Sequence, residues 1–220
     1  MELVPTQDEV LALLRDTGAL QKGHFECLNG LHTDINLETA LAMRHYRDAK
    51  TLSVGLSRKL RANSELRALI PELSIVSATP AGLPVAYGLC EALRAGEVYW
   101  AEKDGPGVPM RFRQFLEPVA GEKVVLVDDI LRSGALLAEA RTLLEARGAQ
   151  VAALAVLVYQ PTPHTYSFES IPLYFLAKIQ ASYYADPGSC ELCRRDVPLD
   201  RVGVVRQVQN REELVTASNF

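Results

Sequence analysis

The chain lacks several features that would direct it to nucleic acids or membranes. Its 23 Lys and Arg residues face 27 Asp and Glu residues, so the formal net charge is -4. Without an excess of positive charge, a partnership with nucleic acid is not expected. The longest apolar run, Val151–Tyr159, is too short to cross a bilayer, and Met1–Leu3 lacks the basic region of a signal peptide. These absences predict a cytoplasmic protein with no membrane partner.

Cysteine is scarce as well, and its spacing is unlike a disulfide framework, because only Cys190 and Cys193 lie close together among four cysteines. These two form a Cys-x-x-Cys in a tight turn, which is half of a zinc site. Zinc would need another ligand, such as Cys27 or a residue of a second subunit. His32 and Asp34 are too few for a metal site of their own, and a hydrogen-bonded loop is the alternative role.

The pattern of apolar residues from position 73 onward predicts the fold class. Short apolar runs alternate with helical segments, and strands are expected at Leu73–Val76, Val98–Trp100, Val124–Val127 and Val151–Val158. A helix is expected at Ala135–Ala146. Alternation of this kind predicts an α/β fold with a mainly parallel sheet of about five strands and helices on both faces.

The first 70 residues carry mainly helical signals. Thr6 and Glu9 form a capping box that opens a helix of about three turns. Asn29–Gly30 is a turn dipeptide between two runs that can pair as a hairpin. Further helices are expected over Asn36–Met43 and Ser57–Ile70.

The most informative segment joins the strand Val124–Val127 to two carboxylates, Asp128 and Asp129, and then to a turn through Ser133 and Gly134. Ligands of open α/β sheets bind at the carboxyl ends of strands, and carboxylates there suit sugar hydroxyls or a divalent cation. The helix N-terminus after the turn favours a phosphate. The alternative is that the acids only solvate the strand end and help to cap the helix. A P-loop nucleotidase would need a Gly-x-x-x-x-Gly-Lys-Ser/Thr loop, which the sequence lacks.

The segment Val124–Gly134 resembles the phosphoribosyl-diphosphate (PRPP) signature of the type I phosphoribosyltransferases. The resemblance implies that Asp128 and Asp129 bind the ribose hydroxyls of PRPP. It also implies a loop for the 5'-phosphate, formed by Arg132, Ser133, Gly134, Ala135 and Leu136. Arg132 and Leu136 stand where the family usually has hydroxyl side chains, so two hydroxyl contacts to phosphate are missing.

Two further segments resemble parts of the same family that handle pyrophosphate. Ile75–Leu83 resembles its pyrophosphate loop, which implies a binding role for Ala78, Thr79, Pro80, Ala81 and Gly82. The segment Val98–Phe115 resembles the flexible catalytic region of orotate phosphoribosyltransferases. That likeness makes Lys103, Arg111 and Arg113 candidates to neutralise the departing pyrophosphate.

The segment Gly23–Asp34 resembles the hood of orotate phosphoribosyltransferases. This likeness implies that Phe25, Asn29 and Thr33 lie near PRPP and the base. Leu28 and Ile35 depart from the family pattern in the same region, which leaves open a base other than orotate.

The resemblance as a whole implies a type I phosphoribosyltransferase fold in one domain. Residues 1–45 would supply an N-terminal helix and hood, residues 46–168 the PRPP-binding core, and residues 169–220 a C-terminal hood with the Cys-x-x-Cys. The implied reaction joins PRPP to a nucleobase, first of all orotate in pyrimidine biosynthesis, with Mg2+ held mainly through PRPP, in a homodimer. The alternatives are another base, such as a purine, or a regulator that binds PRPP or a nucleotide without turnover.

Overall fold

The structure is a computed structural model of the 220-residue chain, and it describes residues 4–27, 30–105, 107–113 and 115–202. Contacts divide the chain into two compact units. The larger comprises residues up to 21 and residues 37–181, and the smaller comprises residues 22–36 and the segment from residue 182 onward. The sequence-based boundaries after residues 45 and 168 stay a prediction.

The larger unit is built on a six-stranded sheet in the order β5-β4-β3-β6-β7-β8. The strands are β3 (Leu73–Ser77), β4 (Val98–Glu102), β5 (Arg111–Phe112), β6 (Lys123–Leu131), β7 (Gln150–Tyr159) and β8 (Leu173–Lys178). All neighbouring pairs are parallel except β4 and β5. The predicted α/β class and mainly parallel sheet are therefore confirmed.

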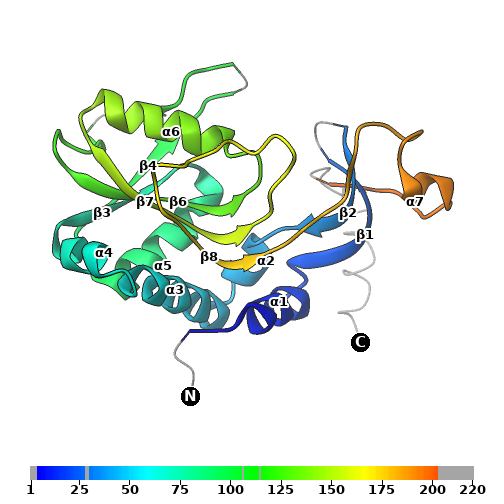
Figure 1. Cartoon of the computed structure of the whole chain (residues 1–220), viewed down its shortest axis with the longest axis horizontal. Helices are drawn as coiled ribbons and strands as arrows, with labels where there is room; N and C mark the ends of the chain where they lie inside the picture. Colours follow the sequence, from blue (N-terminus) through cyan, green and yellow to red (C-terminus); the bar gives the residue numbers. More distant parts are fainter. Residues whose placement is uncertain (1–3, 28–29, 106, 114, 203–220) are drawn as a thin grey trace, which may run out of the picture. The chain divides into compact units, whose positions relative to one another are not determined.

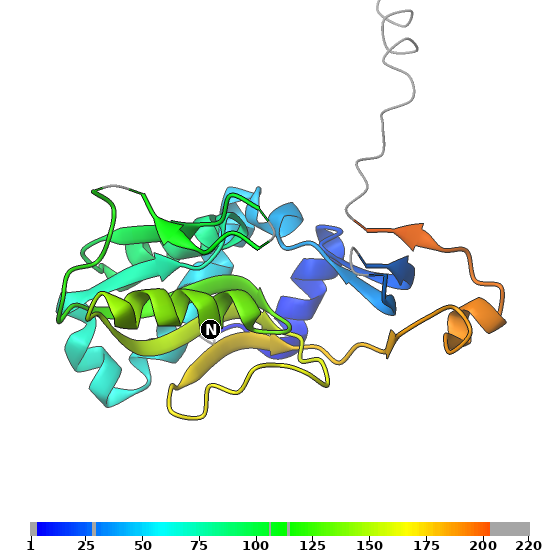
Figure 2. The same cartoon turned by 90° about the horizontal axis from the view of Figure 1, so that it is seen from above.

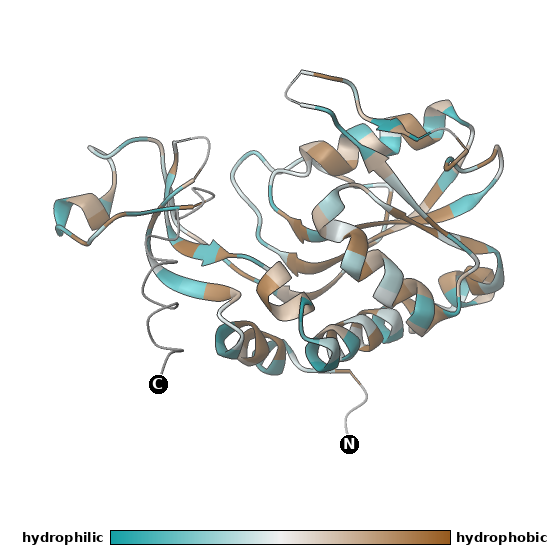
Figure 3. Cartoon of the chain, turned by 180° about the vertical axis from the view of Figure 1, so that it is seen from behind, coloured by the Kyte–Doolittle hydropathy of each residue, from teal (hydrophilic) through white to brown (hydrophobic). Residues whose placement is uncertain are grey.

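Helices cover both faces of this sheet, α6 on one side and α3 and α5 on the other (Figure 1). The helices of the unit are α1 (Gln7–Asp16), α2 (Ala40–Met43), α3 (Tyr46–Arg61), α4 (Ser64–Leu69), α5 (Leu83–Leu93) and α6 (Ala135–Ala146), with 3-10 turns η1 (Ile70–Glu72) and η2 (Pro80–Gly82). The central strands are brown in the hydropathy view, while the helices alternate brown and teal (Figure 3). Among the described residues, no helix is both long enough and apolar enough to span a bilayer.

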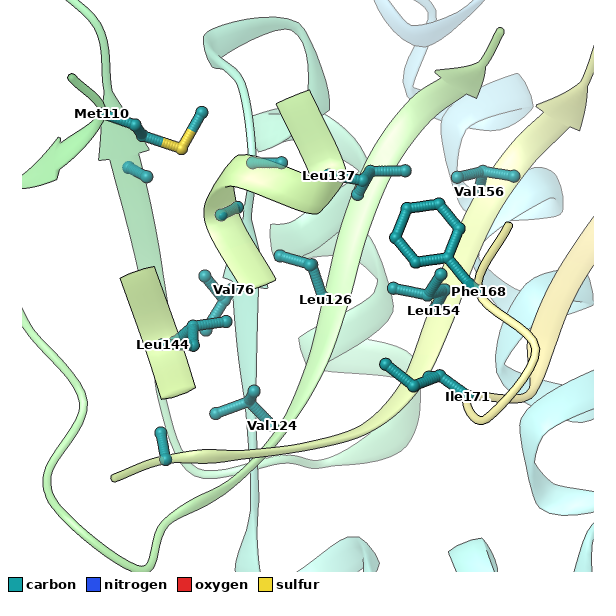
Figure 4. Close-up of a cluster of buried hydrophobic side chains, with 14 of the residues drawn as sticks. Val76, Met110, Val124, Leu126, Leu137, Leu144, Leu154, Val156, Phe168 and Ile171 are labelled. Atoms are coloured by element: carbon teal, nitrogen blue, oxygen red, sulfur yellow. The ribbon is translucent and has the colours of Figure 1, made fainter. Parts of the chain in front are cut away.

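The core between the sheet and α6 follows from the alternation of side chains along a strand. Val124 and Leu126 of β6 lie in one buried cluster with Leu137 and Leu144 of α6 (Figure 4). The intervening residue Val125 is also fully buried, at 0% exposure. Because Val124–Val127 are buried on both faces of the sheet, β6 is continuously apolar over these four residues, up to the two acids.

The helices before β3 differ in part from the sequence-based expectation. The capping box of Thr6 and Glu9 opens α1 as predicted. The helix predicted from Asn36 is wrong at its start, because β2 extends to Leu37 and α2 covers only Ala40–Met43. The helix predicted over Ser57–Ile70 is two helices, since the Asn63 side chain accepts hydrogen bonds from two backbone N–H groups of α4 and so begins a new helix there.

The smaller unit is a four-stranded sheet in the order β10-β1-β2-β9. Its elements are β1 (Leu20–Glu26), β2 (His32–Leu37), β9 (Tyr183–Tyr184), α7 (Glu191–Arg194) and β10 (Asp200–Arg201), of which β1 and β2 each extend into the larger unit at one end. The C-terminal segment pairs with both edges of the β1/β2 pair, as β9 beside β2 and β10 beside β1 (Figure 2). The predicted pairing of the runs around Asn29–Gly30 is confirmed by the β1–β2 neighbourhood, although Asn29 itself lies outside the described residues.

We predict that Leu144→Ala destabilises the larger unit by about 2–5 kcal/mol, because it removes a fully buried side chain and leaves a cavity between α6 and the sheet. Urea denaturation measures the change. The control is Leu136→Ala on the same helix, where the side chain is 42% exposed and the expected change is within about 0.5 kcal/mol. Equal losses in the two variants would contradict the packing described for α6.

Candidate active site

The loop after β3 meets the end of β6 at the carboxyl end of the sheet, because β3 and β6 are paired up to Ser77 and Val127. The loop after β3 turns back so that the Thr79 hydroxyl donates a hydrogen bond of 2.6 Å to Oδ1 of Asp128. The same Thr79 oxygen accepts the Gly82 N–H at 3.1 Å. The segment Ala78–Gly82, predicted to hold pyrophosphate, therefore contacts one of the two predicted ribose-binding acids.

Gly82 is required at this contact for reasons of space. A Cβ on Gly82 would lie 2.7 Å from the Ser77 hydroxyl and 3.0 Å from Oδ1 of Asp128. Neither neighbour can retreat far, since Ser77 and Asp128 are both buried. The absence of a side chain lets the loop backbone approach the carboxylate closely.

The second acid, Asp129, has a partner that the sequence does not reveal. Its Oδ2 accepts a hydrogen bond from the hydroxyl of Thr39, and its Oδ1 accepts the Ile130 N–H at 2.9 Å. Thr39 stands at the N-cap of α2 without making a side-chain cap bond there. Its buried hydroxyl instead serves Asp129. No local signal could identify this residue, because the two are 90 positions apart.

The acids lie within β6 rather than just beyond it, so the expectation that the strand ends before them is wrong. On the β3 side the pairing stops at Val127, but on the β7 side it continues through Asp128 and Ile130 to Leu131. The longer neighbour β7 keeps this part of β6 extended. Adjacent strand residues point to opposite faces, so Asp128 and Asp129 take different partners, Thr79 and Thr39.

Burial changes the acidity of Asp128. Its side chain is only 6% exposed, and loss of hydration together with the charge of Asp129 raises the pKa of Asp128 from 3.8 to about 7. The hydrogen bonds from Thr79 and from the Asp129 N–H oppose this rise. A carboxyl group that titrates near neutrality at the carboxyl end of a parallel sheet is typical of functional sites.

The predicted phosphate loop lies between β6 and the N-terminus of α6. Gly134 caps α6 with a φ of +75°, and a Cβ there would lie 3.0 Å from the Phe168 ring. The carbonyls of Arg132 and Ser133 accept hydrogen bonds from the Thr165 hydroxyl at 2.6 Å and the Tyr166 N–H at 2.7 Å. The Ala135 N–H donates to the Ser133 hydroxyl at 3.4 Å. The first N–H groups of α6 beyond it, from Leu136 onward, form the kind of helix start that attracts an anion.

The Arg132 side chain serves the framework of this loop. Its Nε donates to Oε1 of Gln160 at 2.8 Å, and its Nη2 donates to the Leu37 carbonyl at 2.9 Å. Gln160 is itself buried at the end of β7. Arg132, which stands where the family that the sequence resembles usually has a hydroxyl residue, therefore ties the loop to the ends of β7 and β2.

The three predicted cations around the β4–β5 hairpin all pair with carboxylates. Arg111 contacts Asp104 at 2.8 Å, and Arg113 contacts Glu102 at 2.6 Å. Lys103 donates to Oε2 of Glu139 on α6 at 2.6 Å. In this conformation the structure does not bring these cations to Asp128, whose carboxylate instead accepts hydrogen bonds from Thr79 and the Asp129 N–H.

Glu139 is a further residue that the sequence does not single out. Its Oε1 accepts the Met110 N–H at 2.8 Å while its Oε2 holds Lys103, so one carboxylate fastens both ends of the segment between β4 and β5. These bonds also lower the pKa of Glu139, with the Lys103 hydrogen bond as the largest cause. Glu139 therefore sets the position of the predicted catalytic lysine.

The residues predicted to lie near the base belong to the smaller unit. Phe25 lies on β1 and Thr33 on β2, and both are buried, at 5% and 2% exposure. Asn29 lies outside the described residues. The binding roles of these residues stay a prediction.

Comparison with known proteins agrees with this geometry. The family described as "Phosphoribosyl transferase domain" matches residues 81–192, which include both acids and the loop after them. The chain belongs to the type I phosphoribosyltransferase family. The predicted resemblance and fold are thereby confirmed.

Individual relatives extend the match over most of the chain. An orotate phosphoribosyltransferase of Carboxydothermus hydrogenoformans is 28% identical over 195 residues, covering 89% of this chain and 96% of the relative. Orotate phosphoribosyltransferase 2 of Mesorhizobium japonicum is 30% identical over 178 residues, covering 80% and 87%. The crystal structure of orotate phosphoribosyltransferase from Aeropyrum pernix shares the fold, with a TM-score of 0.60 at 19% identity over 77% of this chain and 93% of that one.

For this phosphoribosyltransferase we predict that Asp128→Asn increases stability at neutral and higher pH. The folded protein holds the Asp128 proton up to about pH 7, whereas the unfolded chain releases it near 3.8, so the ionisation of this group destabilises the folded state as pH rises between these values. The amide removes that cost, on the order of 1–4 kcal/mol above pH 7. Urea denaturation between pH 4 and pH 8 should show a gain that grows with pH and then levels. A gain that is constant with pH, or equal in the exposed-site control Asp8→Asn, would contradict buried ionisation of Asp128 as the cause.

We also predict that Glu139→Ala frees the segment between β4 and β5 of this phosphoribosyltransferase. Trypsin should cleave after Lys103 several-fold faster in the variant, because the lysine loses its ion pair and Met110 loses its N–H acceptor. Mass spectrometry of the first fragments measures the rate. The control is Glu145→Ala, which breaks only the ion pair with Arg141 on the same helix. Unchanged cleavage in Glu139→Ala would remove Glu139 from its positioning role.

Proposed function

We propose that this phosphoribosyltransferase is an orotate phosphoribosyltransferase, which converts orotate and PRPP to orotidine monophosphate and pyrophosphate. The observation that carries the proposal is the contact of the loop Ala78–Gly82 with Asp128, beside Asp129. The proposal is supported by relatives named orotate phosphoribosyltransferase, which this chain matches over most of their length. The proposal has two parts: the reaction, which is transfer of a phosphoribosyl group, and the identity of the accepting base, which is orotate.

Asp128 and Asp129 are proposed to bind the 2'- and 3'-hydroxyls of the ribose. A carboxylate accepts hydrogen bonds from hydroxyls, and two of them on one strand can orient a sugar. Thr79 and Thr39 act as positioning residues, because their hydroxyls hold one oxygen of each acid. The neighbouring negative charges also favour the positive charge that develops on the ribose carbon as pyrophosphate leaves.

Backbone groups are proposed to hold the phosphates. In the loop Ala78–Gly82, small residues allow the backbone to approach the pyrophosphate. In the loop Arg132–Leu136, the helix start of α6 suits the 5'-phosphate without any hydroxyl side chain at positions 132 and 136. Ser133 adds an exposed hydroxyl to that loop.

The donor set fits a magnesium ion, since Asp128 and Asp129 offer the hard oxygen ligands that Mg2+ prefers. When bound with PRPP, Mg2+ would supply positive charge where the pyrophosphate gains negative charge. The chain's own cations add to this: we propose that Lys103 exchanges Glu139 for the pyrophosphate, and that Arg111 and Arg113 assist. Their partners Asp104 and Glu102 hold them at the surface, where exchange costs little.

The remaining assignments concern the base and the assembly. Phe25, Asn29 and Thr33 are proposed to lie near PRPP and the base, in a cytoplasmic homodimer with no nucleic-acid or membrane partner. Light scattering after gel filtration tests the dimer, which would have twice the 24.2 kDa mass of one chain.

The deciding experiment measures pyrophosphate release with PRPP and Mg2+ against orotate, uracil, adenine, guanine, hypoxanthine and xanthine in parallel. We expect turnover with orotate alone. Turnover with another base would keep the chemistry and reject orotate. PRPP binding without any turnover would favour a regulator that retains the fold, an alternative suggested by Arg132 and Leu136 in the phosphate loop.

In the same assay we expect Asp128→Asn and Asp129→Asn each to lower kcat/KM by about 10²-fold or more, because each removes a carboxylate from the ribose site. Both variants should keep the far-UV circular dichroism of the wild type. Asp8→Asn, at an exposed position of α1, serves as the control with unchanged turnover. Full activity of both site variants would exclude the acid pair from the reaction.

A further inference from the structure

The smaller unit contains a cluster of metal-ligating side chains that the proposed reaction does not use. His24 of β1 and His32 of β2 meet Cys190, the N-cap of α7, and Cys193 within that helix. One ligand atom from each of the four residues lies within 4.8 Å of every other. All four residues belong to the smaller unit, so the cluster is complete without any contribution from the larger one.

The nitrogen–sulfur distances fit the edges of a coordination tetrahedron, and the two ring nitrogens lie closer together than such an edge. Bond lengths of about 2.0–2.1 Å to nitrogen and 2.3 Å to sulfur imply edges of about 3.3 Å between nitrogens and about 3.5 Å between nitrogen and sulfur. Nε2 of His24 lies 2.9 Å from Nδ1 of His32. Sulfur lies 3.5 and 3.6 Å from Nε2 of His24, for Cys190 and Cys193, and Cys193 sulfur lies 3.3 Å from Nδ1 of His32.

A hydrogen bond outside the cluster orients one of the ligands. Nδ1 of His24 lies 2.8 Å from the Val197 carbonyl oxygen, which can only accept, so Nδ1 carries the proton. The lone pair of His24 therefore sits on Nε2, which points at both sulfurs and at His32. Metal-ligating histidines characteristically donate their other ring nitrogen to such a carbonyl.

Residues of this cluster make up most of the buried interior of the smaller unit. Among the described residues of the unit, the buried ones are His24, Phe25, His32, Thr33 and Cys190. Three of these five are cluster members, so the centre of the unit holds ligand atoms in place of the aliphatic side chains of an ordinary core. Units of this size commonly need a metal or a disulfide. Cys190 and Cys193 are both free thiols.

We propose that His24, His32, Cys190 and Cys193 bind one structural zinc ion. Two thiolates and two imidazoles form a closed tetrahedral set with no position left for a substrate, which is typical of structural zinc sites. The ion joins α7, which lies between β9 and β10 in the chain, to His24 of β1 and His32 of β2. This ligand set needs neither Cys27 nor a second subunit, and Asp34 is engaged elsewhere, because it accepts the Ser182 N–H at 2.8 Å.

The chain supplies matched controls, because each ligand type also occurs outside the cluster. We expect the purified full-length protein to contain one zinc per chain by elemental mass spectrometry. Cys190→Ser and His32→Gln should each lose most of it, while Cys90→Ser and His164→Gln should retain it. Retention of zinc by a Cys190→Ser/His32→Gln double variant would overturn the proposed ligands.

A second measurement covers the case in which the ligand variants fail to fold. The wild-type protein is stripped with a chelator under reducing conditions and titrated with Co2+ alone. Tetrahedral thiolate coordination predicts intense visible absorption that saturates at one Co2+ per chain and disappears on addition of Zn2+. Absence of zinc in the purified protein together with no Co2+ spectrum would overturn the proposal. Neither readout involves turnover, so failure of the orotate assay leaves the zinc test unaffected.

Discussion

The parallel pairing of β3 with β6 is the constraint on which the candidate active site depends. It aligns Ser77 with Val127, and the next residues of the two strands are then forced to share one space. Thr79 reaches Asp128 there, and Gly82 fits only because it has no side chain. The loop after β3 and the end of β6, which are separated in sequence by α5, β4 and β5, thus form one surface of backbone groups and carboxylates. Ligands of open α/β sheets bind at such a surface.

This arrangement places negative charge where the fold tolerates it poorly. The raised pKa of Asp128 reflects lost hydration and the nearby charge of Asp129. Hydroxyls of Thr79 and Thr39 hold the acids without adding a compensating positive charge. Without a ligand, the ionised acid pair therefore destabilises the folded protein. The pair is complementary to a ligand that brings cations or a developing positive charge, which agrees with the phosphoribosyltransferase chemistry of the family.

The two units reach their stability by different means. The larger unit buries continuous apolar strands between helices, and its core surrounds β6 on both faces. The smaller unit has few buried apolar side chains among its described residues. Its centre holds nitrogen and sulfur atoms of four residues that lie within 4.8 Å of one another. The proposed zinc ion would give this small sheet the fixed geometry that apolar packing gives the larger sheet.

The sequence alone determined the features that depend on neighbouring residues. Alternating apolar runs predicted β6, β7 and α6, and the acid pair with its following turn predicted the ligand-binding edge, because these signals lie within one element and its loop. Only the tertiary structure decided the contacts between distant positions: Thr39 with Asp129 at a separation of 90 residues, Glu139 with Lys103 at 36, and Cys190 with His24 at 166. Such contacts depend on strand order and on where each chain segment returns, and no periodicity in a single sequence encodes either.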